Sequence, residues 1–160
     1  MVRMFTLFML FLGSAGGVLA AETAKEARKA VEEEYERYHQ AVKRKDVDAI
    51  MALLTPNYVW KMPDGTIYDY HQTKAALKSY YRTVRAVTDI STQIHRMTVQ
   101  GNRAIAVVTE RVVLQTADSP RTIRTEHYRE TWVKTARGWK IRQTELFKEQ
   151  VRREDKPKKT

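Results

Sequence analysis

The chain has 160 residues, contains no cysteine and carries a formal charge of +10, from 29 basic and 19 acidic side chains. The lack of cysteine excludes thiol catalysis, disulfide bonds and zinc–thiolate sites, so the fold must be stabilised by its core. A strongly basic chain can bind nucleic acid, but here Lys and Arg are scattered over all predicted elements and concentrated in residues 151–160. We therefore predict a basic surface and no nucleic-acid partner.

The first 20 residues have the pattern of a secretory signal peptide. Arg3 supplies a positive charge, residues 4–12 are apolar apart from Thr6, and residues 13–17 are rich in Gly. This apolar run is far shorter than the roughly 20 residues that a membrane-spanning helix needs, and we expect cleavage after Ala20. The sequence therefore predicts a secreted or periplasmic protein with no membrane anchor after cleavage, in which residues 21–150 form one domain.

Two helices are predicted at the start of this domain. Apolar residues recur at spacings of three and four between Ala24 and Lys45, which predicts a long amphipathic helix with one buried stripe. Asp46 is suited to cap a second, short helix that extends to Leu54 and is ended by Pro56.

A short hairpin and a third helix follow. Residues 57–61 and 66–70 are predicted strands on either side of the turn sequence Pro63-Asp64-Gly65. Residues 73–86 then have the periodicity of a helix.

Four long strands complete the domain. The pattern predicts strands at residues 90–100, 103–116, 122–134 and 139–149, and a disordered charged tail at residues 151–160. The order helix, helix, hairpin, helix and four-stranded meander indicates an α+β fold with a mostly antiparallel sheet of about six strands.

The first long hairpin suggests a catalytic pair. Gly101-Asn102 is suited to be a two-residue turn, which would pair Gln100 with Arg103 and place His95 and Glu110 on the same inward face. A carboxylate beside an imidazole raises the pKa of the imidazole and orients it as a general base. The alternative is that both side chains lie near strand ends and are solvated.

The last hairpin suggests a second site. Its apolar residues align if Trp132 pairs with Ile141, which puts Glu130 opposite Gln143 and on the same inward face as Tyr128. A buried carboxylate needs a hydrogen-bonding partner, and such a group can act as a base or proton donor. The alternative is a structural hydrogen-bonded group that holds the strands together.

Several short motifs occur together along the domain. They are residues 45–50 (KDVDAI) before 53–58 (LLTPNY), the turn at 63–65, Asn102-Arg103-Ala104, and residues 130–132 (ETW) with 138–141 (GWKI). This set resembles the nuclear transport factor 2-like superfamily, which includes SnoaL-like and ketosteroid isomerase-like proteins, over residues 24–149. The resemblance implies three helices packed in the concave face of a curved sheet, forming a cone-shaped barrel with a pocket at its open end. Because members include isomerases, cyclases, dehydratases and non-catalytic modules, the fold alone does not define the function.

Aromatic residues occur on the elements expected to line this cone, and they suit a flat apolar ligand, although some must belong to the core. The predicted ligand-binding residues are Tyr38, Tyr58, Trp60, Tyr81 and Tyr128, together with Gln143. The four histidines share no metal-ligand spacing, so neither a metal nor a cofactor is expected.

The primary prediction is an exported protein that binds a small organic ligand without an assigned reaction and forms a homodimer through the outer face of the sheet. The first alternative is an isomerase, cyclase or lyase of the ketosteroid isomerase-like type, with Glu130, Glu110 and His95 as candidate catalytic residues. The second is a non-catalytic interaction module. A deep pocket that holds a carboxylate of raised pKa would favour the enzyme, whereas a pocket filled by its own side chains would favour the module.

Overall fold

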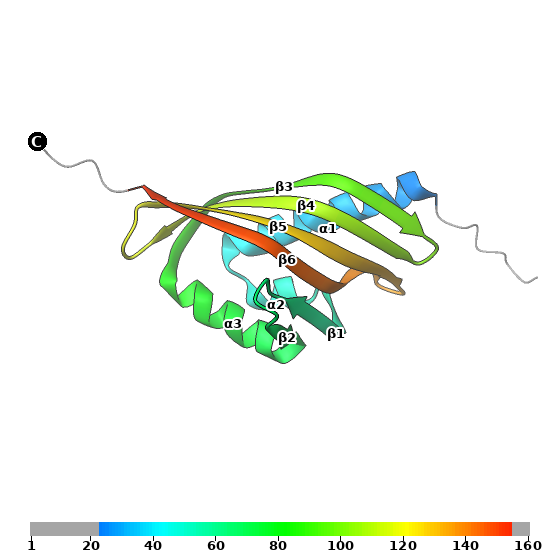
Figure 1. The fold of residues 1–160 in the computed structure, drawn as a ribbon, viewed down its shortest axis with the longest axis horizontal. Coiled ribbons are helices and arrows are strands. Elements are labelled where there is room, and N and C mark those ends of the chain that lie inside the picture. Colours follow the sequence, from blue (N-terminus) through cyan, green and yellow to red (C-terminus); the bar gives the residue numbers. More distant parts are fainter. Residues whose placement is uncertain (1–22, 155–160) are drawn as a thin grey trace, which may run out of the picture.

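The computed structural model describes residues 23–154, which form three helices and one six-stranded sheet (Figure 1). The elements in chain order are α1 (Ala24–Arg44), α2 (Val47–Met51), β1 (Leu54–Lys61), β2 (Ile67–Asp69), α3 (Tyr70–Thr83), β3 (Val84–Gln100), β4 (Arg103–Thr116), β5 (Arg121–Thr135) and β6 (Gly138–Glu154). The strand order is β2-β1-β6-β5-β4-β3, and every neighbouring pair is antiparallel except β1 and β6. The predicted α+β class and order of elements are confirmed. The predicted signal peptide lies outside the described residues.

Helix α1 forms as its periodicity predicts. Thr23 and Glu26 make a capping box, in which each side chain accepts a hydrogen bond from the other residue's backbone N–H. The apolar stripe, which includes Ala27, Val31 and Tyr35, is buried against the sheet. None of the helices within residues 23–154 is both long enough and apolar enough to cross a bilayer.

The junction between α1 and α2 lies at Lys45, which adopts the left-handed conformation with a φ of 55°. Asp46 then accepts a hydrogen bond from the N–H of Ala49 at 3.0 Å and caps α2 as predicted. Helix α2 ends at Met51, before the predicted end, because Leu54 already belongs to β1 and pairs with β6.

Helix α3 begins at Tyr70, three residues before its predicted start at residue 73. A second capping box causes this, since Asp69 accepts from the N–H of Gln72 at 2.8 Å and Gln72 accepts from the N–H of Asp69 at 3.0 Å. Strand β3 begins directly after the helix at Val84, because Val84 and its neighbours pair with the end of β4.

Two β-bulges change the predicted strand register. The predicted pairs Gln100–Arg103 and Trp132–Ile141 are both present. The β3–β4 register shifts between Ile94 and Arg96, so that His95 is an extra residue and Ile94 pairs with Val108. The β5–β6 register shifts between Thr131 and Trp132, with two consequences for the predicted site that are described below.

Strand β6 is longer than predicted. Residues 151–154 were expected to be disordered, but they pair with β5, and Glu154 forms a 2.7 Å ion pair with Arg121. A segment with few apolar side chains can form a strand here because backbone hydrogen bonds, rather than the burial of side chains, join it to the sheet. The remaining residues of the predicted tail, 155–160, lie outside the described residues.

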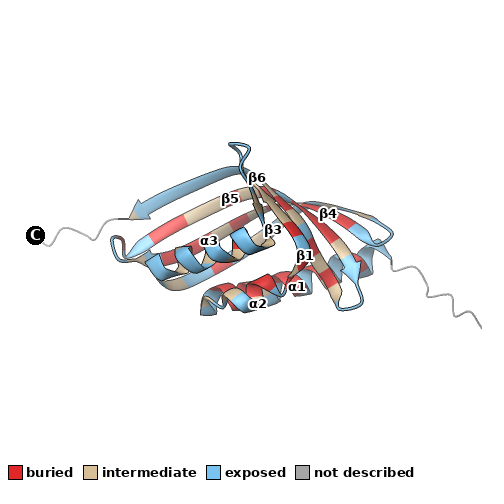
Figure 2. Ribbon diagram, turned by 90° about the horizontal axis from the view of Figure 1, so that it is seen from below, coloured by how far each residue is buried: buried red, intermediate tan, exposed pale blue. Residues whose placement is uncertain are grey.

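The core lies between α1 and the face of the sheet that we call the inner face (Figure 2). Alternation along β4 and β5 brings every second side chain to this face. The first core cluster consists of Ala27, Val31, Tyr35, Tyr58, Ala104, Ala106, Val108, Tyr128, Trp132, Trp139, Ile141 and Leu146. The second consists of Ala41, Val42, Ile50, Val84, Ile90, Val112 and Leu114.

The turn between β5 and β6 offers a test of local strain. Gly138 has a φ of 92°, and a Cβ there would lie 3.3 Å from Oε1 of the buried Glu34, which is ion-paired with Arg37 at 2.7 Å. Gly65 has a similar φ of 88°, but a Cβ there would meet open space. We expect Gly138→Ala to lower the free energy of unfolding by about 1–3 kcal/mol, and by more than Gly65→Ala, in urea titrations. Equal losses would show that the Glu34 contact has no effect.

Candidate functional site

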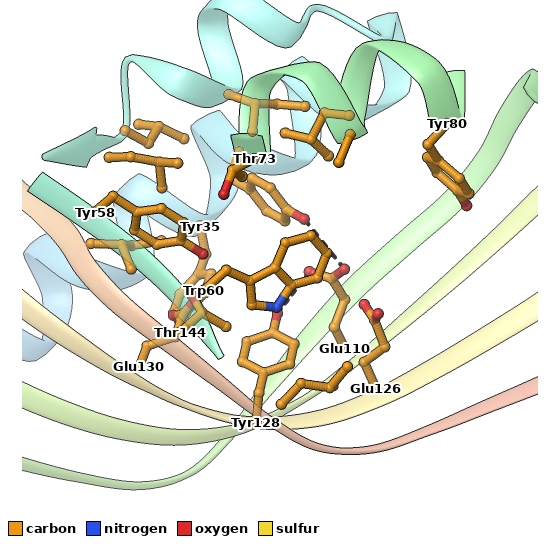
Figure 3. A pocket seen from close by; sticks show the side chains of 18 of the residues that line it. Tyr35, Tyr58, Trp60, Thr73, Tyr80, Glu110, Glu126, Tyr128, Glu130 and Thr144 are labelled. Carbon is orange, nitrogen blue, oxygen red and sulfur yellow. Dashed lines mark hydrogen bonds between the residues drawn. The ribbon is translucent and has the colours of Figure 1, made fainter. Parts of the chain in front are cut away.

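A cavity of about 210 Å³ lies between the helices and the inner face of the sheet (Figure 3). Tyrosine, tryptophan and aliphatic side chains form most of its wall. Four ionisable side chains from β4 and β5 also line it, namely Glu110, Arg124, Glu126 and Glu130. Ionisable groups on an apolar wall are costly for folding, so their surroundings decide what the cavity can do.

Glu130 is almost completely buried on β5, with both of its hydrogen bonds on one oxygen. The Tyr35 hydroxyl and the Trp132 indole N–H both donate to Oε2 of Glu130, the latter at 3.0 Å. Burial raises the pKa of Glu130 to about 7, although these two hydrogen bonds act in the opposite direction. Glu130 can therefore change its protonation state near neutral pH.

Glu110 on β4 is 1% exposed and receives one hydrogen bond on each oxygen. Tyr128 donates to Oε2 at 2.9 Å and Tyr38 donates to Oε1 at 3.3 Å. Burial, and then the nearby carboxylate of Glu126, raise the pKa of Glu110 to about 8, against the opposing effects of Arg124 and the Tyr128 hydrogen bond. The protonated form of Glu110 therefore predominates at pH 7.

Glu126 lies directly opposite Glu110 in the β4–β5 ladder, and Figure 3 shows the two carboxyl groups side by side. Glu126 differs from Glu110 because it is ion-paired with Arg124 at 3.5 Å. Burial nevertheless raises the pKa of Glu126. The Arg124 guanidinium also lies 4.7 Å from the centre of the Tyr80 ring, in a cation–π contact.

The tyrosines of the cavity remain hydrogen-bond donors over the whole physiological pH range. Burial raises the pKa values of Tyr35, Tyr38 and Tyr128 well above the usual value, and the nearby carboxylates raise them further. Each tyrosine therefore keeps its proton and can only share it, either with a carboxylate or with a bound molecule.

Residues 35–148 match the family model described as a SnoaL-like domain. The chain is a member of the SnoaL-like family. A comparison with curated proteins finds no match. Among solved structures, the SnoaL-like chain is similar to the Kfla4162 protein of Kribbella flavida, with 18% identity, a TM-score of 0.68 and coverage of 80% of this chain and 95% of that one.

Two further structures have names that refer to an activity. A candidate scytalone dehydratase from Novosphingobium aromaticivorans is 16% identical, with a TM-score of 0.68 and coverage of 83% of this chain and 94% of that one. A ketosteroid isomerase-like protein from Erwinia carotovora is 17% identical, with a TM-score of 0.60 and coverage of 75% and 95%. At these identities the likeness is one of fold alone. Together with the match to the SnoaL-like family model, it supports the resemblance to the nuclear transport factor 2-like superfamily that the sequence indicated.

The cavity of this SnoaL-like protein brings together most of the ligand-binding and catalytic residues that were predicted from the sequence. Four of the six predicted ligand-binding residues line it, namely Tyr38, Tyr58, Trp60 and Tyr128, as do the candidate catalytic residues Glu110 and Glu130. Tyr81 does not line the cavity and packs against the second core cluster.

His95 was predicted to face the interior beside Glu110, and this placement is wrong. The bulge at His95 turns its side chain to the outer face, where Nε2 lies 2.7 Å from the hydroxyl of Thr109. Thr109 must be on the outer face because its neighbour Glu110 is on the inner one. The same hydroxyl lies 2.9 Å from Nδ1 of His127, so both histidines are outside the cavity.

Gln143 was predicted to lie opposite Glu130, and this placement is also wrong. The β5–β6 bulge pairs Gln143 with Thr131 and places Thr144 opposite Glu130. Gln143 lines a groove on the outer face with Arg129 and Thr131, whereas Thr144 lines the cavity. The polar partners of Glu130 are therefore Tyr35 and Trp132.

Other cavity residues did not emerge from the sequence. Arg124 and Glu126 continue the inward alternation of Tyr128 and Glu130, so extending the same face by four residues would have found both. Tyr35 lies on the buried stripe of α1, and nothing in the sequence reveals that its hydroxyl reaches Glu130. Within the described part of the chain, no cluster of three or more His, Asp or Glu side chains is arranged to hold a metal ion.

Proposed function

We propose that this SnoaL-like protein binds a small, largely apolar organic molecule in its cavity and transfers a proton within it, as an isomerase or a lyase does. The observation that carries this proposal is the pair of buried carboxyl groups, Glu130 and Glu110, whose pKa values are raised to about 7 and about 8 on an otherwise apolar wall. Carboxyl groups tuned to the pH of their surroundings are suited to general acid–base catalysis.

Glu130 is the proposed base. Tyr35 and Trp132 stabilise its ionised form by donating to Oε2, and no described residue donates to Oε1, which is left free to accept a proton. In an apolar cavity the ionised carboxylate is poorly solvated, which increases its basicity toward a C–H group next to a carbonyl.

Glu110 is the proposed acid. Its protonated form can donate a proton to the carbonyl oxygen of the ligand while Glu130 removes a proton from the adjacent carbon, so that a neutral enol forms and the negative charge moves from Glu130 to Glu110 rather than onto the ligand. If Glu130 returns its proton to a different carbon while the enol proton returns to Glu110, the ligand is isomerised. If the proton of Glu130 instead goes to a leaving group on the next carbon, that group departs, the enol proton again returns to Glu110, and the carbonyl re-forms beside a new C=C bond, which is a lyase reaction. The names of two similar structures, a candidate dehydratase and an isomerase-like protein, support this class.

An open cavity argues against a pure interaction module, which would fill this space with its own side chains. Export and homodimerisation through the outer face stay predictions from the sequence.

The proposal is tested with 2-tetralone, a bicyclic ketone with acidic hydrogens next to its carbonyl. We expect the protein to accelerate the exchange of these hydrogens for deuterium, followed by proton NMR in deuterated buffer. Because Glu130 must be ionised and Glu110 protonated, the rate should be bell-shaped in pH, with limbs near 7 and 8. Exchange no faster than in buffer, together with no thermal stabilisation by 2-tetralone or related cyclic ketones, would contradict the proposal.

A further inference from the structure

Thr73 on α3 is a buried polar residue whose hydroxyl has no partner. It is 3% exposed, it lines the cavity, and its Oγ1 makes no hydrogen bond. A threonine inside a helix usually satisfies its hydroxyl by donating to the carbonyl one turn earlier, but this one does not. A buried hydroxyl without a partner destabilises the fold, so its presence calls for a physical reason.

Thr73 lies near the beginning of α3, next to residues that contact other parts of the fold. The capping box of Asp69 and Gln72 defines the first turn of α3, and Lys74 forms a 2.7 Å ion pair with Asp48 of α2. Thr73 lies one residue beyond this first turn and is directed at the cavity (Figure 3). The hydroxyl thus lies on the helical wall, whereas Glu110 and Glu130 are on the sheet wall.

Comparison with other unpartnered atoms distinguishes Thr73. Thr55 and Thr122 also have buried hydroxyls without a partner, but neither lines the cavity. Arg124 lines the cavity and its Nε has no hydrogen bond, but Glu149 lies 4.0 Å away and Glu126 neutralises its charge. Thr73 therefore combines burial, a place on the cavity wall and an unused hydrogen-bonding group.

We propose that Thr73 is a ligand-contacting, specificity-determining residue, and that the molecule bound in the cavity carries a second oxygen function that hydrogen-bonds to the Thr73 hydroxyl. This inference rests on the proposed function for the position of the first oxygen, the carbonyl that meets Glu110. A hydroxyl both donates and accepts, so it suits an alcohol, a phenol or a second carbonyl. The ligand class is accordingly a compact cyclic ketone with a further oxygen substituent, rather than a plain hydrocarbon ketone.

The test uses calorimetric titration to compare 2-tetralone with the derivatives that carry one hydroxyl on the aromatic ring, which are positional isomers of one another. We expect wild-type protein to bind at least one of these isomers roughly 10-fold more tightly than 2-tetralone. The reason is that the ligand hydroxyl gives the buried Thr73 hydroxyl the hydrogen-bond partner that it lacks in the free protein. Thr73→Val should bind the two compounds equally, whereas Thr73→Ser should retain the preference. Thr122→Val is the matched control: it removes an equally buried, unpartnered hydroxyl away from the cavity and should leave the preference unchanged.

Stability supplies an independent readout. Because Val is nearly isosteric with Thr and removes an unsatisfied group, both Thr73→Val and Thr122→Val should melt at the wild-type temperature or about 2–4 °C higher. A lower melting temperature for Thr73→Val would show that the hydroxyl has a structural role and would overturn the proposal.

The remaining outcomes separate this inference from the proposed function. Suppose that the wild type catalyses deuterium exchange but binds no hydroxylated isomer more tightly than 2-tetralone, or that Thr73→Val keeps the preference. Either outcome overturns the role of Thr73 and leaves proton transfer in place. A preference that depends on Thr73 without any exchange supports the ligand contact and contradicts proton transfer. If no compound binds to wild-type protein, both proposals fail.

Discussion

Replacing Glu130 with Gln is expected to slow the deuterium exchange of 2-tetralone by roughly 10²–10⁴-fold, the usual contribution of a general base. The amide has nearly the same shape as the carboxyl group and can still accept hydrogen bonds from Tyr35 and Trp132, so the cavity should keep its form. The amide cannot take up a proton, however. The exchange rate should therefore fall, and the limb of its pH profile near 7 should be lost. NMR exchange rates over pH 5–9, compared for wild type and variant, check both effects.

Glu126→Gln is the matched control for this experiment. Glu126 is also a buried carboxyl group on the inward face of β5, but it forms an ion pair with Arg124, and its proposed role is to balance the charge of that side chain. We expect less than a roughly 10-fold change in rate, mainly through the pKa of Glu110, which the charge of Glu126 helps to raise. If Glu126→Gln proves as inactive as Glu130→Gln, the assignment of Glu130 as the base is wrong.

The main lines of the fold could be predicted because they depend on local patterns. Helical periodicity located α1, the Gly101-Asn102 turn set the β3–β4 register at its closed end, and aligning Trp132 with Ile141 set the β5–β6 register. These features act over a few residues, so one sequence contains enough information to recognise them. The inward positions of Glu110 and Glu130 follow from them.

The errors arise where the sheet departs from simple alternation. A bulge adds one residue to one strand, which exchanges inside and outside for every residue beyond it. His95 lies within such a bulge and Gln143 directly after one, so both were placed on the wrong face. Nothing that we identify in the residues around either position specifies a bulge.

The hydrogen-bond partners within the cavity depend on contacts between distant parts of the chain. Tyr35 and Glu130 are 95 positions apart, and Tyr38 and Glu110 are 72 apart. Alternation and periodicity show which face a residue occupies but not which side chain it meets across the core. The raised pKa values, and hence which of the two candidate carboxyl groups is the proposed acid and which the base, could therefore be recognised only from the folded structure.

The same buried carboxyl groups predict an unusual dependence of stability on pH. In the folded chain the pKa of Glu110 is raised to about 8 from its usual 4.5, mainly by burial. Between these two pH values the unfolded chain loses this proton and the folded chain keeps it. The contribution of Glu110 to the free energy of unfolding is therefore complete below about pH 4.5 and is lost as the pH rises to 8. At about 1.4 kcal/mol per pKa unit, the expected loss amounts to a few kcal/mol.

Glu110→Gln should remove this loss, because the amide does not titrate. The free energy of unfolding is measured by urea titration at pH 5, 7 and 9. Relative to wild type, the value for the variant should increase by a few kcal/mol between pH 5 and pH 9, with most of the increase below pH 8. Titrating groups other than Glu126, which lies opposite Glu110 and raises its pKa, cancel in the difference between the two proteins. Glu33→Gln, at an exposed position on α1, controls for the loss of one negative charge. Parallel stability curves for wild type and Glu110→Gln would show that Glu110 is ionised in the folded chain at neutral pH, and it could then not be the acid.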